Sequence, residues 1–266
     1  MFDLKNPTLR KRLADGPALG AFWFALGNIA VIEAALHAGA EAIVIDMQHG
    51  LFDRASLEAA VGIVPASVPC LVRVEDDTPT AIGRALDAGA EGIIVPLVET
   101  AEQATNAAAA CRYPPKGRRS GGGVRPLRDF AGYLRAADQA IAVGVMIETR
   151  VGVDNAAAIA GADGVDFVFI GTGDLGLSLG TAPGSETHEK ACRMILAACR
   201  KAGTPCGIFT FGGESAAERI AEGYAMAIVA NDISAVGEYF AAAAASFREA
   251  TQGVGRTATR RGKTKR

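Results

Sequence analysis

Eight short apolar runs recur along the chain, separated by longer stretches that are rich in alanine. Each run is almost wholly apolar instead of alternating between apolar and polar positions. This pattern is typical of strands that are buried on both faces of a parallel sheet. The strands predicted from these runs are 18–24, 42–47, 70–74, 92–98, 141–147, 165–170, 206–210 and 226–230.

The stretches between the runs have the composition and length of helices. The predicted helices cover 29–38, 54–64, 78–88, 100–111, 150–160, 186–202, 214–222 and 232–249. Four of them end beside a glycine, which tolerates the left-handed backbone that terminates helices: Gly39, Gly89, Gly203 and Gly223. Eight repeated βα units in one chain of 266 residues predict an α/β fold, a single (β/α)8 or TIM barrel.

One segment interrupts the alternation of predicted strands and helices. Residues 113–128 are rich in proline, glycine and arginine, and an extra helix is predicted at 129–140. A loop of this length inside a compact domain is often functional, and strands are predicted on either side, so we expect no domain boundary there. We expect one barrel domain over residues 1–255, followed by a basic, flexible tail over 256–266 with six positive charges and no acid.

Composition narrows the class of protein. Half of the residues are hydrophobic, which is enough for a large core, and a formal net charge of −2 argues against a nucleic-acid partner. The five cysteines form no CxxC pair, the N-terminus has no apolar signal region, and no apolar run is long enough to cross a bilayer. We therefore expect a cytoplasmic protein with small-molecule substrates and no membrane partner.

Polar side chains gather at the C-terminal ends of the predicted strands, where the active site of a (β/α)8 barrel lies. They are Asp46, His49, Arg73, Glu148 and Asp174. Glu148 and Asp174 offer the oxygen ligands that hard cations such as Mg²⁺ or Mn²⁺ prefer. Such a cation can chelate a 2-oxo acid and stabilise its enolate as a Lewis acid, while a histidine moves the proton and an arginine stabilises negative charge.

No lysine occupies a predicted strand end, which disfavours an aldolase that works through a Schiff base. Each of the acids also has a structural explanation. Asp46 could cap the following turn, Glu148 could begin a helix, and Asp174 could belong to an Asx turn. Arg73 could pair with the acids at 75–77 on the surface. Their joint occurrence at strand ends favours the functional interpretation.

The segment Gly171–Gly176 matches the GxGxxG pattern of dinucleotide-binding proteins. That fingerprint requires a helix directly after it, whereas the next stretch is broken by Gly180 and Pro183. We therefore expect no NAD, and expect these glycines to let backbone N–H groups approach a substrate carboxylate. His37 and His188 fall on predicted helices and are interpreted as structural or surface residues.

Five motifs follow one another along the chain: DMQHG at 46–50, LVRV at 71–74, RYPPKG at 112–117, MIET at 146–149 and GTGDL at 171–175. Together they resemble the signatures of the HpcH/HpaI aldolase family, and most closely its class II, metal-dependent pyruvate aldolases. The resemblance extends from about residue 18 to residue 250. It implies a (β/α)8 barrel and a homo-oligomer, a trimer or hexamer, in which neighbours exchange the C-terminal helix.

The resemblance also implies residue roles. Glu148 and Asp174 would ligate Mg²⁺, Mn²⁺ or Co²⁺, and the backbone N–H groups of Gly173 and Asp174 would hold the pyruvate carboxylate. Three further roles follow in the same way. His49 with Asp87 would form the acid/base pair, Arg73 would bind substrate and stabilise the enolate, and Asp46 would hold metal-bound water from the second coordination sphere.

The chain departs from the family pattern at three places. Gln48 replaces an acid, Gly171–Leu175 replaces a proline-containing motif, and Arg119–Gly123 differs in its glycine–serine order. We expect reversible cleavage of a 4-hydroxy-2-oxo acid to pyruvate, or a related 2-oxo acid, and an aldehyde. The departures bear on the aldehyde. The alternatives are an acyl-CoA lyase like citrate lyase β-subunits and a non-catalytic barrel that binds a metabolite.

Overall fold

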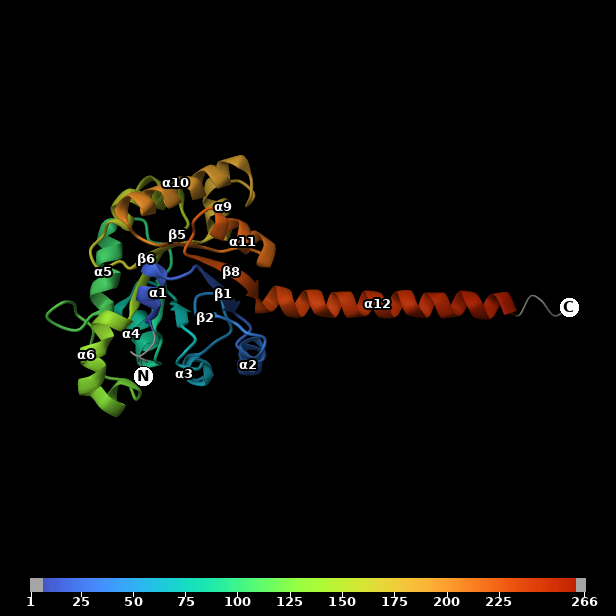
Figure 1. The fold of residues 1–266 in the computed structure, drawn as a ribbon, viewed down its shortest axis with the longest axis horizontal. Helices are drawn as coiled ribbons and strands as arrows, with labels where there is room; N and C mark the ends of the chain where they lie inside the picture. Colours follow the sequence, from blue (N-terminus) through green and yellow to red (C-terminus); the bar gives the residue numbers. More distant parts are fainter. Residues whose placement is uncertain (1–6, 262–266) are drawn as a thin grey trace.

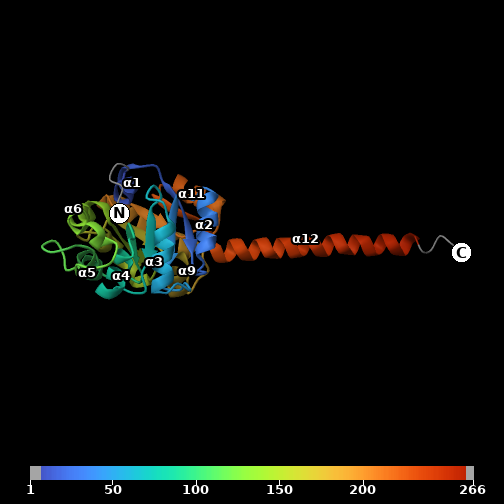
Figure 2. The same ribbon diagram turned by 90° about the horizontal axis from the view of Figure 1, so that it is seen from below.

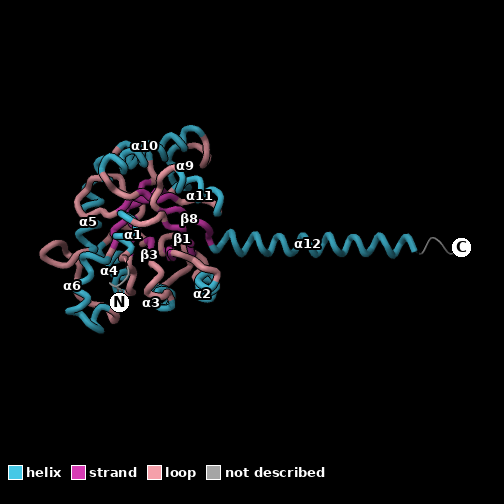
Figure 3. The backbone as a smooth tube through the Cα atoms, in the orientation of Figure 1, coloured by secondary structure: helices cyan, strands magenta, loops and turns pink. Residues whose placement is uncertain are grey.

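The computed structural model describes the chain from residue 7 to residue 261, with side chains described as far as residue 251. Within this range, eight parallel strands form a closed barrel in chain order, and β8 closes on β1 (Figure 3). The strands are β1 Leu19–Phe24, β2 Ala42–Asp46, β3 Cys70–Arg73, β4 Gly92–Val95, β5 Ala142–Ile147, β6 Phe167–Ile170, β7 Cys206–Ile208 and β8 Met226–Asn231. All eight predicted strands and the predicted barrel are confirmed.

The barrel wall separates two apolar layers. Along β6, Phe167 and Phe169 belong to the cluster inside the barrel, whereas Val168 and Ile170 belong to the cluster between barrel and helices. All four side chains are buried. Burial on both faces is the reason that the strands appear in the sequence as unbroken apolar runs.

Helices surround the strands on the outside of the barrel (Figure 1). Their bounds are α2 Ile29–His37, α3 Arg54–Ile63, α4 Pro79–Asp87, α5 Ala101–Cys111, α6 Phe130–Ala140, α7 Arg150–Asp154, α8 Ala156–Ala160, α10 Glu186–Ala202 and α11 Gly213–Ala221. The helix predicted at 150–160 is divided at Asn155. The glycines expected at four helix ends all have positive φ, as the cap requires: Gly39, Gly89, Gly203 and Gly223.

Three short helices were not predicted. They are α1 (Leu9–Asp15), the 3₁₀ helix η1 (Pro126–Asp129) and α9 (Thr172–Leu179). α1 covers the N-terminal end of the barrel, where Leu9 and Leu13 join the interior cluster. The backbone N–H of Leu9 donates to Glu91 at 2.6 Å. Seven residues are too few for a clear helical periodicity, so the position of α1 depends on these tertiary contacts.

The arginine-rich segment between α5 and α6 is anchored by Arg119. The Arg119 side chain is 1% exposed and lies over the rings of Tyr113 and Tyr133, 4.7 and 5.3 Å from their centroids. It donates from Nη1 to the Tyr133 hydroxyl and from Nη2 to Asp87, each at 3.0 Å. These contacts attach the segment to the end of α4.

α12 (Asp232–Arg261) leaves the barrel after β8 and projects away from it as one long helix (Figures 1 and 2). The Asp232 carboxylate accepts the backbone N–H groups of Ala25 and Leu26, at 2.9 and 2.8 Å, which fixes the start of the helix beside β1. The domain boundary predicted at residue 255 falls inside α12, and the flexibility of the basic tail stays a prediction. Among the described residues, no helix is both long and apolar enough to span a bilayer.

Candidate active site

Strands β2 and β3 pair so that Asp46 lies directly beside Arg73 at their C-terminal ends. The Arg73 guanidinium donates to the Asp46 carboxylate through two bonds, from Nε at 2.9 Å and from Nη2 at 2.6 Å. Both side chains are buried. Arg73 therefore pairs with Asp46 and not with the acids at 75–77, so the interpretation of Arg73 as a surface ion-pair residue is wrong.

Trp23 on β1 contacts both members of this pair. Its indole Nε1–H donates to Asp46 at 3.3 Å, and its ring lies 4.9 Å from the Arg73 guanidinium carbon. Burial opposes ionisation of Asp46, but the hydrogen bonds and charge of Arg73 and the backbone N–H groups that follow Asp46 lower its pKa overall. Within the described residues, Arg73 Nη1 makes no hydrogen bond, so this nitrogen is left for a ligand.

His49 lies on the turn after β2, and Asp46 holds this turn by accepting the backbone N–H groups of Gln48 and His49 at 3.0 and 3.3 Å. Asp46 thus also caps the turn, as its structural explanation predicts. The His49 residue is exposed, and its ring forms no hydrogen bond within the described residues. The Gln48 amide oxygen is buried without a partner in the same part of the structure. His49 is therefore placed to meet a molecule from outside the chain.

Glu148 directly follows β5 and is 1% exposed. Its carboxylate accepts the backbone N–H of Leu97 at 2.8 Å. Leu97 has a φ of 56°, a left-handed conformation that residues other than glycine seldom adopt and that is often found at functional sites. Burial raises the pKa of Glu148 to about 7, and the neighbouring Asp174 contributes in the same direction, while the Leu97 N–H and the charge of Arg73 act against the shift.

Asp174 lies in the first turn of α9, which begins inside the GxGxxG segment. The expectation that no helix directly follows these glycines is therefore wrong. The N–H groups at the start of a helix lack partners within it, so those of Gly173 and Asp174 are available to an anion. A Cβ added to Gly173 would meet no atom within 4 Å, which shows that the space beside this turn is open.

Glu148 and Asp174 have the donor chemistry of a divalent-cation site. They are close enough to raise the pKa of Glu148, and a cation between them would stabilise the ionised pair. A Cβ on Gly171 would overlap the Glu148 carboxylate, so glycine is required where β6 ends beside it. Among the described residues, no group of three or more His, Cys, Asp or Glu side chains could hold a metal. A cation held by two carboxylates would keep positions for substrate oxygens.

His188 on α10 supports the turn that carries Asp174. It is 1% exposed, and its Nδ1 accepts the backbone N–H of Gly184 at 3.3 Å. Its Nε2 therefore carries the proton and donates to the Thr172 carbonyl at 3.0 Å. The interpretation of His188 as structural is confirmed, and the side chain acts on the first residue of α9. His37 is exposed on α2.

Asp87 lies at the end of α4, away from the residues that the strands bring together. Its carboxylate pairs with Arg119 at 3.0 Å, and within the described part of the chain no hydrogen bond joins it to His49. The structure of one chain therefore does not assemble the expected His49–Asp87 pair, which stays a prediction.

Sequence reasoning missed Trp23 and Leu97, and it missed the contacts of Arg119. Trp23 is the one tryptophan of the chain and lies inside a predicted strand, so its position resembled that of a core residue. Leu97 and Arg119 act through their partners, Glu148 and Asp87, which lie 51 and 32 positions away in the chain. Arg119 lies in a segment compared with the family pattern, but neither residue shows a local pattern that reveals its partner.

The sequence of the chain matches a known protein family and is similar to proteins named as aldolases. The family model described as HpcH/HpaI aldolase/citrate lyase matches residues 20–238. The chain is 37% identical to a 4-hydroxy-2-oxovalerate aldolase of Rhodococcus jostii, over 91% of this chain and 96% of that protein. It is 38% identical to a hydroxypyruvate/pyruvate aldolase of Rhizorhabdus wittichii, over 82% of this chain and 89% of that protein.

Solved structures share the same fold. The crystal structure of an HpcH/HpaI aldolase/citrate lyase family protein from Burkholderia cenocepacia superposes with a TM-score of 0.86 at 33% identity. The superposition covers 91% of this chain and the whole of that chain. The likeness therefore includes the complete barrel and is not confined to the motifs at the strand ends.

Proposed function

Because the chain belongs to the HpcH/HpaI aldolase/citrate lyase family and is a carbon–carbon lyase of its aldolase type, we propose that it reversibly cleaves a 4-hydroxy-2-oxo acid to pyruvate, or a related 2-oxo acid, and an aldehyde. In this reaction the bond between C3 and C4 breaks and the 4-hydroxyl loses its proton. The electron pair passes to the pyruvyl unit as an enolate, which is then protonated at C3. The lyase assignment disfavours the non-catalytic barrel.

The proposal includes a divalent cation, Mg²⁺, Mn²⁺ or Co²⁺, held by Glu148 and Asp174. When bound, the cation would act as a Lewis acid toward the oxygens of the 2-oxo acid. The Leu97 N–H orients the Glu148 carboxylate, because it occupies one of the two oxygens at 2.8 Å. The metal requirement rests on this donor set and on the family resemblance.

Arg73 and the start of α9 would bind the anionic parts of the substrate. The free Nη1 of Arg73 would donate to the enolate oxygen as negative charge develops there. Asp46 fixes the guanidinium through two hydrogen bonds, so the donor is oriented before substrate binds. The N–H groups of Gly173 and Asp174 would hold the carboxylate.

His49 would transfer the proton between the 4-hydroxyl and solvent, because its ring is exposed and free of partners within the described residues. Asp87 would pair with His49 to form the acid/base pair. In the isolated chain Asp87 is bound to Arg119, so the pairing would require another copy of the chain. Asp46, which already accepts five hydrogen bonds, would hold water of the cation's coordination sphere.

The observation that carries the proposal is the buried Glu148 beside Asp174, with Arg73 close enough to act on the same carboxyl group. The test is pyruvate release from 4-hydroxy-2-oxo acids, measured before and after treatment with EDTA and after each cation is restored. We expect EDTA to abolish activity and Glu148→Gln to lower kcat by at least about 100-fold. Glu75→Gln, an exposed acid after β3, is the matched control and should retain activity.

Full activity after chelation would refute the metal requirement. Full activity of the Glu148→Gln variant would refute the assignment of the site. If neither treatment matters and no 4-hydroxy-2-oxo acid releases pyruvate, the proposed reaction is wrong.

We also propose that the protein is a homo-oligomer, a trimer or hexamer. α12 carries exposed Ile233, Phe240 and Phe247 at intervals of seven residues, which places the three side chains along one face of the helix. Most of this helix projects beyond the barrel (Figure 2). A second copy of the chain that receives α12 would bury this stripe.

A further inference from the structure

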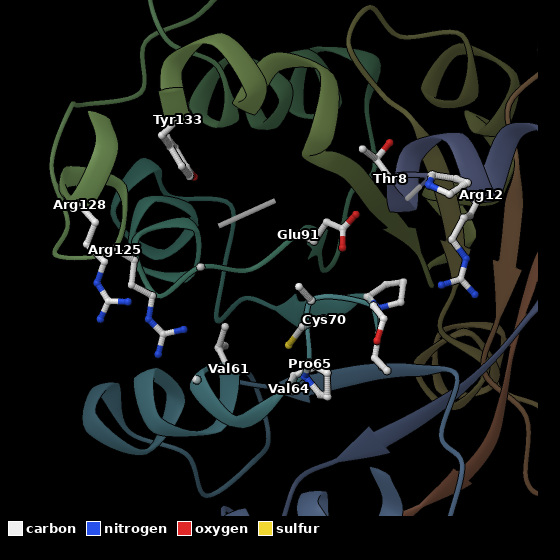
Figure 4. A pocket seen from close by; sticks show the side chains of 17 residues that line it. Thr8, Arg12, Val61, Val64, Pro65, Cys70, Glu91, Arg125, Arg128 and Tyr133 are labelled. Carbon is white, nitrogen blue, oxygen red and sulfur yellow. The ribbon is translucent and has the colours of Figure 1, made fainter. Parts of the chain in front are cut away.

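A cavity of about 400 Å³ lies at the N-terminal end of the barrel wall (Figure 4). The candidate active site lies at the C-terminal ends of the strands, on the opposite side of the barrel. Cys70 begins β3 and Glu91 directly precedes β4, so both mark the N-terminal ends of their strands. The end of α3 with the loop that follows it, α1 and the segment before α6 provide the remaining sides. The volume is within the range of small-molecule sites.

Three arginines line this cavity. Arg12 on α1 lies on one side, whereas Arg125 and Arg128 lie together on the other (Figure 4). Within the described residues, neither Arg12 nor Arg128 forms an ion pair or a side-chain hydrogen bond. Neither guanidinium is therefore bound to a carboxylate of the described chain.

The side chain of Arg125 is held in place by its neighbours. Its guanidinium donates to the backbone carbonyl of Glu58 on α3. A Cβ on Gly62 would lie 2.7 Å from Nη2 of Arg125, and one on Gly89 would lie 3.1 Å from its Cδ. The two glycines leave room for this side chain, and the hydrogen bond holds its charge at the cavity.

The middle of the cavity is different in character. Val61, Val64, Pro65 and Cys70 form an apolar surface between the two groups of arginines (Figure 4). Glu91 is the one acid among the described residues that line the cavity. Its carboxylate accepts the Leu9 N–H, and burial raises its pKa while that hydrogen bond and the charge of Arg12 act against the shift. Even with Glu91 ionised, the three arginines outnumber this acid and leave the lining positively charged.

We propose that this cavity binds an elongated organic dianion, with one anionic group at Arg12, the other at Arg125 and Arg128, and an apolar chain between them. A dianion matches the two separate groups of positive charge, and an apolar middle matches the surface that joins them. This cavity is separate from the candidate active site that contains Glu148. Its ligand is therefore bound in addition to the substrate.

The probes are straight-chain α,ω-dicarboxylates of four to ten carbons, added to the full-length protein in EDTA so that no cation can recruit them to the other site. Thermal unfolding and calorimetric titration measure binding, because a ligand that prefers the folded state raises Tm. We expect one chain length to bind best. The monocarboxylate of equal length and inorganic phosphate, each at matched ionic strength, should bind at least about tenfold more weakly.

Arg12→Gln and Arg128→Gln should each weaken binding of the dicarboxylate at least about tenfold, because each removes an anion contact without removing a described ion pair. Arg118→Gln, an exposed arginine of the same segment that does not line the cavity, is the matched control and should bind normally. Binding should persist in Arg73→Gln. Loss of binding in Arg73→Gln would indicate that the ligand binds in the candidate active site, and it would overturn the proposal.

Equal binding of mono- and dicarboxylates, or binding that is unchanged in both Arg12→Gln and Arg128→Gln, would show a nonspecific salt effect and also overturn it. So would the absence of binding at every chain length. Each outcome is independent of whether the protein cleaves 4-hydroxy-2-oxo acids.

Discussion

At the scale of single residues, the site depends on side chains whose properties are set by one or two neighbours. Arg73 is oriented by two hydrogen bonds to Asp46 and by the ring of Trp23. Glu148 is buried, with one oxygen on the Leu97 N–H. These neighbours therefore set the orientation of the Arg73 guanidinium and the raised pKa of Glu148.

Arg73→Lys tests the value of the fixed guanidinium. Lysine keeps the positive charge but cannot form the two parallel bonds to Asp46 and also present a third nitrogen to substrate. We expect kcat for pyruvate release to fall by about 100-fold or more, with a smaller change in KM. Arg84→Lys, on the exposed side of α4, should leave both constants unchanged, and equal kinetics of the two variants would contradict the role of Arg73.

Glu148 predicts a pH dependence of stability in the metal-free protein. Its pKa is about 7 in the folded chain against an ordinary value of 4.5, so the folded state binds the proton more tightly. Its stabilising contribution is complete below pH 4.5 and is lost as the pH rises through about 7. In EDTA, we expect the free energy of unfolding to fall across this window by about 3 kcal/mol more than in Glu148→Gln.

Urea unfolding at several pH values measures this difference. The Glu148→Gln variant is the control for the natural chain, because glutamine keeps the shape of the side chain but does not titrate. Parallel pH curves for the two proteins would show that Glu148 ionises normally.

At the scale of elements, α9 decides where Asp174 lies. Two glycines in eight residues give α9 a poor intrinsic helix propensity. It is stabilised by the burial of Leu175 and by the hydrogen bond from His188 to the carbonyl of Thr172, at its first residue. The turn that presents Asp174 and the N–H groups proposed to bind the substrate carboxylate is therefore supported from α10.

His188 is accordingly expected to be a positioning residue. His188→Phe removes the donor to Thr172, and we expect the concentration of cation needed for half-maximal activity to rise about tenfold or more. His188→Gln can place an amide N–H near the position of Nε2 and should restore most of the affinity. His37→Phe on α2 is the control. A Phe variant that loses stability but keeps its cation affinity would limit His188 to a structural role.

At the scale of the whole molecule, the long α12 is the main observation behind the proposed homo-oligomer. Its exposed stripe of Ile233, Phe240 and Phe247 has the spacing of a helix that packs along a partner. Asp87, bound to Arg119 and apart from His49, is a second sign that one chain does not contain the complete proposed machinery. Both observations favour an assembly in which copies of the chain contribute to one another.

Phe240→Asp tests this assembly. A charge in the stripe would remain unpaired in a helix interface, so we expect the molecular mass from light scattering to fall and activity to fall with it. Ser246→Asp adds the same charge beside the stripe and should keep the mass of the natural chain. A natural chain that is monomeric at working concentration would refute the homo-oligomer.

The sequence by itself determined the barrel and identified most of the candidate site residues. Strands buried on both faces must be apolar at every position, so all eight were visible as runs in the sequence. Because parallel strands of a barrel end at the same mouth, the acids and the arginine that follow them could be predicted to lie together before any contact was known. That rule brought Asp46, Arg73, Glu148 and Asp174 into one site.

Only the tertiary structure decided how these residues are held. The Leu97 N–H reaches Glu148 across 51 positions, Arg119 reaches Asp87 across 32, and His188 reaches Thr172 across 16. The short helices α1 and α9 also depend on packing, because their own residues are too few or too rich in glycine to specify a helix. Local pattern reports burial and periodicity, whereas the direction of a hydrogen bond between distant segments exists only once the chain has folded.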